Sequence, residues 1–118
     1  MRPPSPTGKP LSTPVLHILL VLSEGARHGY AIKQEVERRS DGAIRLGPGT
    51  LYEAIQRLQD DGLIAEAAAA APINGQEAQR RYYQLTNRGW SLLRGEVRRL
   101  GQLVAQVRAN PRLNKELA

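Results

Sequence analysis

Residues 28–64, HGYAIKQEVERRSDGAIRLGPGTLYEAIQRLQDDGLI, decide the fold of this 118-residue chain. Two short amphipathic helices are expected here, over residues 29–39 and 48–62, with the turn residues 40–42, SDG, between them. The second helix gathers its apolar side chains on one side: Leu51, Ile55 and Leu58. Two helices in this order are typical of a helix-turn-helix, which places its second helix in a groove of DNA.

The chain before this segment predicts a first helix that is apolar on every side. Ser12 or Thr13 is suited to begin it, and Gly25 is suited to end it. A helix that is apolar all round is buried on most of its faces, which a small single copy cannot easily arrange. We therefore expect Leu16 and Leu20 to take part in a homodimer interface.

The chain after the segment predicts a β-hairpin. Residues 63–71 and 81–85 are the expected strands, joined through residues 72–76, PINGQ, whose Asn-Gly pair tolerates a positive φ. Two strands after a recognition helix form the wing of a winged helix. Residues 44–46 alternate in polarity and are expected to form one further short strand. The predicted fold class is therefore mainly α with a small β-hairpin: a winged helix-turn-helix plus a C-terminal dimerisation helix.

That last helix is expected to begin at Thr86 or Asn87 and to end at Asn110-Pro111. Apolar residues recur along it at spacings of three and four: Trp90, Leu93, Val97, Leu100, Val104 and Val107. Such a row predicts pairing with a second copy, and packing on the helix's own domain is the alternative.

The resulting organisation has four parts. We expect a flexible N-terminal arm (1–11), a winged helix-turn-helix DNA-binding domain (12–86), a C-terminal dimerisation helix (87–110) and a tail (111–118).

Composition excludes several classes of protein. The chain has no cysteine and two histidines, so it forms no disulfide or thiolate metal site, and we expect no metal or cofactor. It has no paired-carboxylate motif, P-loop or Ser/His/Asp constellation, so we expect no enzyme. The longest apolar run, residues 15–22, is far shorter than the ~20 residues of a membrane span. Because the start of the chain also lacks the apolar core of a secretory signal, we expect a cytoplasmic protein without a membrane partner.

The net charge of +6 is unevenly distributed along the chain. Residues 80–115 hold nine Lys and Arg and one acid, Glu96, whereas residues 1–79 carry a net charge of −1. A basic surface favours a polyanionic partner such as double-stranded DNA, because each neutralised phosphate releases counterions. An ordinary solvated surface explains the charge alone equally well.

The polar side of residues 48–62 carries groups suited to DNA. Gln56 is suited to adenine, Arg57 to guanine or a phosphate, and Glu53 to cytosine. Thr50, at the start of the helix, is suited to a phosphate, and Tyr52 lies on the flank of this side. An ordinary solvated face is the alternative interpretation.

Residues outside this helix complete the expected contacts. Arg80 and Arg81 lie where the wing returns, so we expect them to contact phosphates or the minor groove, although surface arginine pairs are common. His28 is expected to cap or pack the helix over residues 29–39. The inner side of that helix is expected to hold Tyr30, Ile32 and Val36.

Taken together and in this order, four motifs resemble the PadR family of bacterial transcriptional regulators. They are LHILLVL at 16–22, HGYAI at 28–32, GTLYEAIQRLQDDGLI at 49–64 and RRYYQLTNRG at 80–89. The resemblance covers residues 12–108, and the short chain after the wing resembles the subfamily that ends in one dimerisation helix.

The resemblance implies a winged helix-turn-helix homodimer, usually a repressor, that binds a palindromic operator. By matched motif, Thr50, Tyr52 and Arg57 would face DNA. Tyr82 and Tyr83 would pack and brace the returning wing strand. The last helix would pair with its mate and with the first helix of the other subunit.

Three positions depart from the family pattern. Glu53 stands where members often carry proline, and a glutamate facing DNA either reads a base or lowers affinity. Residues 72–79, PINGQEAQ, are nearly neutral where the wing is usually rich in Arg and Lys. Leu100 stands where multidrug-sensing relatives have an aromatic residue, which does not support a flat stacking site for drugs.

Two other functions remain compatible with the sequence. A possible small-molecule effector, apolar or phenolic, would bind at the dimer interface and weaken DNA binding, and Trp90 is suited to stack on it. A winged-helix protein-interaction module would instead bind DNA weakly, without sequence preference and only at low salt.

Overall fold

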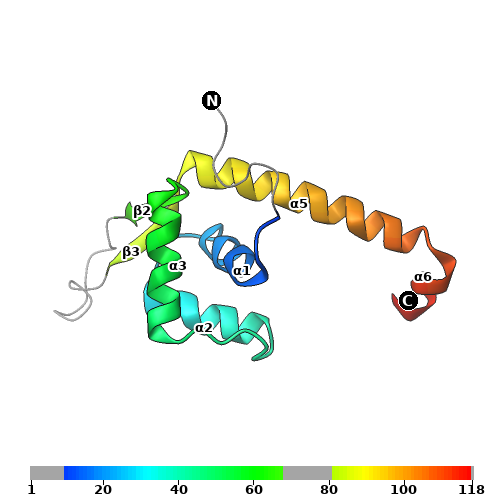
Figure 1. Ribbon diagram of the computed structural model, residues 1–118, viewed down its shortest axis with the longest axis horizontal. Coiled ribbons are helices and arrows are strands. Elements are labelled where there is room, and N and C mark those ends of the chain that lie inside the picture. Colours follow the sequence, from blue (N-terminus) through cyan, green and yellow to red (C-terminus); the bar gives the residue numbers. More distant parts are fainter. Residues whose placement is uncertain (1–9, 68–80, 118) are drawn as a thin grey trace.

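The computed structural model describes residues 10–67 and 81–117. Three helices form a body beside a small sheet, and a long helix extends away from this body to a short final helix (Figure 1). The helices are α1 (Thr13–Leu22), α2 (Gly29–Arg39), α3 (Pro48–Asp60), α5 (Asn87–Arg108) and α6 (Pro111–Leu117). Helices α2 and α3, with the turn between them, form the expected helix-turn-helix.

The sheet has three short antiparallel strands in the order β1-β3-β2. They are β1 (Arg27–His28), β2 (Ile64–Ala67) and β3 (Tyr82–Leu85). The pairing of β2 with β3, in which Ile64 opposes Leu85, confirms the two strands expected after α3. Both are shorter than expected within the described chain, and the expected Asn-Gly turn lies outside the described residues.

The prediction of a further strand at residues 44–46 was wrong. This stretch follows a turn in which Asp41 and Gly42 have positive φ, and it carries no strand pairing. Its apolar character serves the core instead, since Leu46 is buried and Ile44 packs against the core. The third strand is β1, where Arg27 opposes Tyr83; two residues are too few to show an alternating pattern.

One hydrophobic core joins every element of the body. It contains Ile18 and Leu19 of α1, Ile32 of α2 and Ile55 of α3, and it extends to Leu93 of α5. The start of α5 is therefore part of the same domain as the wing.

A network around Thr86 fixes the start of α5. The Thr86 hydroxyl accepts a hydrogen bond from the Gly89 N–H at 3.0 Å and donates one to the Gly62 carbonyl at 2.7 Å. An added Cβ at Gly89 would lie 2.1 Å from the Leu63 carbonyl oxygen, so the helix approaches the end of α3 through a position that only glycine fits. Thr86 is thus the N-cap, one of the two residues expected.

Both ends of the described chain are more ordered than the expected arm and tail. The N-terminal strap, which we define as residues 10–12, leads into α1, where Ser12 is the N-cap. Leu11 packs against the core, and residues 1–9 of the expected flexible arm lie outside the described residues. Pro111 ends α5 as expected but also begins α6, because proline is well suited to the first turn of a helix. The tail is therefore helical.

Candidate nucleic-acid interface

Helix α3 presents a full polar face to solvent. Leu51, Ile55 and Leu58 are buried on its inner side, as expected. The outer side exposes all of the residues that the sequence assigned to DNA in this helix: Thr50, Tyr52, Glu53, Gln56 and Arg57. Because Gly47 and Pro48 begin the helix with no side-chain cap, the first turn also leaves backbone N–H groups available.

The middle of this face is acidic rather than basic. Glu53, Gln56 and Asp60 occupy it, and the Gln56 amide nitrogen donates a hydrogen bond to the Asp60 carboxylate at 3.0 Å. The two carboxylates of this strip repel phosphates, which disfavours non-specific contact with the DNA backbone there. Glu53 is thus placed where it can accept a hydrogen bond from a base.

One flank of the face is formed by Tyr52. Tyr52 is 51% exposed, and its hydroxyl lies so close to Gly29 that an added Cβ at Gly29 would be 2.7 Å from it.

Tyr30 is 55% exposed, so the prediction that it lies on the inner side of α2 was wrong. The buried positions of that helix are Gly29, Ile32 and Val36, and Tyr30 lies outside this row. It was missed because an aromatic residue in an amphipathic helix suggests burial.

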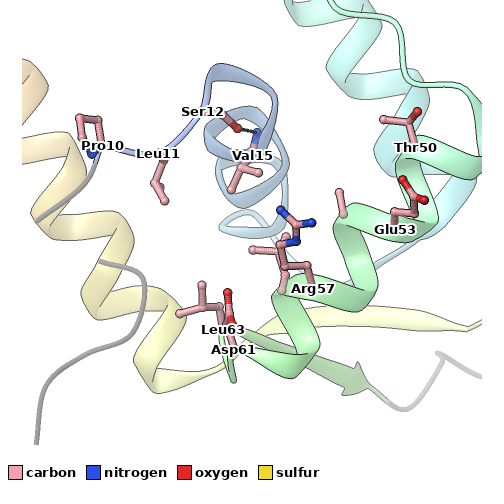
Figure 2. Close-up of a pocket in the computed structure, with 11 residues that line it drawn as sticks. Pro10, Leu11, Ser12, Val15, Thr50, Glu53, Arg57, Asp61 and Leu63 are labelled. Carbon is pink, nitrogen blue, oxygen red and sulfur yellow. Dashed lines mark hydrogen bonds between the residues drawn. The ribbon is translucent and has the colours of Figure 1, made fainter. Parts of the chain in front are cut away.

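The other flank of the face borders a groove between α3 and the start of α1 (Figure 2). This α1–α3 groove has a volume of about 380 Å³. Its lining combines the strap and α1 on one side with α3 and the residues after it on the other: Pro10, Leu11, Ser12, Val15, Thr50, Glu53, Ala54, Arg57, Leu58, Asp61 and Leu63. Figure 2 shows Arg57 directed across the groove toward α1. Within the described residues Arg57 has no ion pair, so its charge is available to a ligand.

The returning wing contributes one described arginine. Arg81 is largely exposed and lies 3.7 Å from the Glu66 carboxylate, a long and solvated ion pair that costs little to exchange for a phosphate. Arg80 and residues 72–79 lie outside the described residues, so the predictions made for them stay predictions.

His28 holds the start of the helix-turn-helix. Its Nδ1 accepts a hydrogen bond from the Ala31 N–H at 3.2 Å, so it is the N-cap of α2. Its ring also meets the Tyr82 ring edge-on, with 5.4 Å between the ring centroids. The capping and packing roles expected of His28 are both confirmed, and Tyr82 braces the junction of sheet and helix.

The residues assigned to a dimer interface divide into two groups. Leu93 is 4% exposed within a single chain and belongs to the core, while Leu16, Leu20 and Trp90 are partly buried against it. The second group lies on residues 97–108, the distal half of α5, which reaches beyond the body in Figure 1. There Val97 and Val104 remain 49% and 46% exposed, with Leu100 and Val107 partly exposed.

Glu96 is a buried charge that sequence reasoning did not assign to any site. It is 7% exposed and accepts two hydrogen bonds from the Arg99 guanidinium, at 2.7 and 3.0 Å. It also accepts one from the Leu11 N–H at 3.1 Å. The hydrogen bonds from Arg99, and then that from Leu11, hold the pKa of this carboxyl below its ordinary value, against the opposing effect of burial. Glu96 is the single acid among residues 80–115, and this isolation is the sequence signal that could have pointed to it.

Among residues 10–67 and 81–117, no cluster of three or more His, Cys, Asp or Glu side chains is placed to hold a metal ion. No helix in those ranges is both long and apolar enough to span a membrane.

The arrangement of helix-turn-helix, exposed α3 and three-stranded wing sheet defines a winged helix-turn-helix protein. The family model for the PadR-like transcriptional regulators matches residues 18–95. The chain therefore belongs to the PadR-like family, which confirms the resemblance seen in the motifs. This is a family of transcriptional regulators and not of enzymes.

Relatives and solved structures agree with this assignment. Over 92 residues the chain is 34% identical to "Transcriptional regulator Rv3488" of Mycobacterium tuberculosis, a match that covers 78% of this chain and 79% of that protein. It is also 34% identical over 90 residues to an uncharacterised 37.1 kDa protein in transposon TN4556 of Streptomyces fradiae, covering 76% of this chain but 24% of that protein. The solved structure of a PadR-like transcription factor from Bacteroides fragilis aligns with a TM-score of 0.65 at 25% identity, covering 80% of this chain and 86% of that one.

Proposed function

We propose that the protein is a homodimeric, sequence-specific DNA-binding regulator that represses transcription from a palindromic operator. The observation that carries this proposal is the exposed face of α3, which combines base-reading groups with a free arginine on a helix held by the core. In this role Gln56 and Glu53 read bases and Arg57 contacts guanine or a phosphate. Thr50 and Tyr52 position the helix, and Arg80 and Arg81 support the wing.

The homodimer is supported by the distal half of α5. Val97 and Val104 expose apolar surface in one row, with Leu103 beside it, and the described residues do not cover this surface. We propose that a second copy covers this row and that both α3 helices lie on one side of the assembly. Their half-sites would then lie about one helical turn, ~34–36 Å, apart on the duplex.

The experiment is a mobility-shift titration with a duplex selected by this protein from a random-sequence pool, at two salt concentrations. We expect the selected duplex to keep its advantage over a scrambled one at the higher salt. Arg57→Ala should weaken its binding about tenfold while sedimentation shows an unchanged dimer. Arg112→Ala, which removes the same charge from an exposed position in α6, is the matched control. If both variants lose the same affinity, general charge attraction explains the binding, and Arg57 has no specific place in the DNA interface.

An effector is the second candidate function, and one cavity favours it. An open hollow on the surface of α5 is lined by Leu103, Val104, Val107 and Arg108, so a ligand held there would lie at the proposed dimer interface. Trp90 lies ~20 Å further back along the helix. Its partly buried ring is covered by the Arg94 guanidinium, whose carbon lies 5.6 Å from the ring centroid. A ligand in the hollow would therefore be detected by its effect on DNA binding rather than by quenching of Trp90.

A further inference from the structure

Glu96 connects the helix that carries the exposed apolar row to the face that carries Arg57. The carboxylate lies on α5, and its bond to the Leu11 N–H spans 85 positions of sequence. Leu11 belongs to the strap, and the strap forms one wall of the α1–α3 groove. The opposite wall is α3 itself. No other hydrogen bond from a side chain of α5 reaches the strap among the residues that the structure describes.

The geometry around Glu96 is more specific than a surface ion pair. One of its oxygens, Oε2, accepts from both the Leu11 N–H and an Arg99 nitrogen, while Oε1 accepts from Arg99 alone. A carboxylate with this degree of burial requires such partners, because an unpaired charge would be costly there. Arg99 alone would have satisfied the charge on the same helix. The additional bond to Leu11 fixes the backbone of the strap one residue before Ser12, the N-cap of α1.

We propose that Glu96 is a positioning residue for DNA binding, which acts through the strap to keep Arg57 directed across the α1–α3 groove. This inference rests on the proposed DNA-binding function. Arg57 lines the groove together with Leu11 and Val15 of the opposite wall, and Figure 2 shows its side chain directed toward that wall. When the Leu11 N–H loses its acceptor, the strap part of that wall is no longer fixed to α5, and the Arg57 side chain gains freedom there. Ordering the side chain on DNA then costs more conformational entropy, and affinity falls.

Substitutions of Glu96 and of its neighbour Arg99 should have different effects on DNA binding. Glu96→Ala removes the acceptor of the Leu11 N–H and should weaken binding to the selected duplex about fivefold, within the range of coupled neighbours. Glu96→Gln keeps an oxygen that accepts from Leu11, so it should restore most of the affinity. Arg99→Gln leaves the Glu96–Leu11 bond in place and should bind like the natural chain. An Arg99→Gln variant as weak as Glu96→Ala would overturn the proposal, because the ion pair rather than the strap would then be responsible.

A double-mutant cycle distinguishes positioning from a general loss of structure. In the Arg57→Ala background, Glu96→Ala should change affinity less than twofold, since the side chain that it positions is gone. In the Tyr52→Phe background, on the other flank of α3, the full fivefold effect should persist. A fivefold loss in both backgrounds would show that Glu96 supports the whole domain and would overturn the proposal.

A measurement without DNA keeps this test independent of the proposed function. Amide hydrogen exchange followed by NMR should show a protected Leu11 amide in the natural chain and in Arg99→Gln. The same amide should exchange at least tenfold faster in Glu96→Ala, with the core amides of α1 unchanged. If no duplex can be selected, the proposed function fails while this result still stands. Unaltered exchange at Leu11 in Glu96→Ala would overturn the link between Glu96 and the strap.

Discussion

The two halves of α5 share one pattern of apolar spacing but have different surroundings. In the first half, Gly89 and Leu93 are buried against the body, and Glu96 is buried with them. In the distal half, Val97 and Val104 stand half exposed although they continue the same row. The first half therefore contributes to the stability of a single chain, while the second leaves apolar surface exposed, where we propose that a second copy packs. The apolar spacing of the sequence alone does not reveal where α5 leaves the core of the single chain.

Leu93 and Val104 give the largest contrast between the two halves. Leu93→Ala should lower the free energy of unfolding by about 3 kcal/mol, because it leaves a cavity in a closed core. Val104→Ala removes half-exposed surface and should change the unfolding of a single chain by less than about 0.5 kcal/mol. Urea denaturation at low protein concentration measures the first effect, and sedimentation over a concentration series measures dimer dissociation.

The dimer should respond in the opposite order. Val104→Ala should weaken association, whereas Leu93→Ala, once folded, should leave the surface of the distal half unchanged. If Val104→Ala destabilises the chain as much as Leu93→Ala while association stays constant, the division of α5 proposed here is wrong.

Gly89 and Gly95 sharpen the comparison with an identical substitution. Gly89→Ala adds a Cβ that would lie 2.1 Å from a backbone oxygen, so the helix must shift and stability should fall by about 2 kcal/mol. Gly95→Ala meets no atom within 4 Å and should stabilise the helix by up to about 1 kcal/mol. Thermal unfolding of both variants checks the pair. A Gly95→Ala change as damaging as Gly89→Ala would mean that this side of α5 is not open.

Local patterns in the sequence predicted the helix-turn-helix well. The apolar side of α3 follows helical periodicity, Gly62 takes the positive φ expected after a helix, and Thr86 has the chemistry of an N-cap. Such features depend on neighbours a few positions away, so a single sequence contains them. Together with the family motifs, they were enough to predict the exposed face of α3.

Features that depend on distant contacts were not predicted. Strand β1 is only two residues long and exists because β3 provides a partner. Leu93 and Val97 look alike in the sequence, and only the packing of the body distinguishes them. The bond between Glu96 and Leu11 joins segments 85 positions apart, and no spacing rule reaches that far. These contacts place the strap and the start of α5. They therefore determine the surroundings of the polar face of α3, such as the α1–α3 groove, rather than the face itself.

The smallest expected effect concerns pH, and it tests whether the first half of α5 depends on the charge of Glu96. The pKa of this carboxyl in the folded chain is below its ordinary value of 4.5, chiefly through the Arg99 hydrogen bonds. A lowered pKa means that the ionised form favours folding. The resulting stability is fully present above pH 4.5 and is lost as the pH falls through the folded value. Glu96→Gln does not titrate, so its unfolding free energy should decline less than that of the natural chain below pH 4.5.

Only the difference between the two proteins isolates Glu96, because other carboxyls also contribute to acid sensitivity. Hydrogen bonds from Arg38 and Arg39 lower the pKa of Glu35 to about 2, and the Arg39 bond lowers that of Glu24. Both are unchanged in Glu96→Gln and cancel when its urea-denaturation curves are compared with those of the natural chain at each pH. Parallel declines of the two proteins from pH 6 to pH 3 would mean that Glu96 is held by geometry rather than by its charge. The strap would then depend on an oxygen acceptor alone, and the near-natural affinity expected of Glu96→Gln for DNA would follow from the same fact.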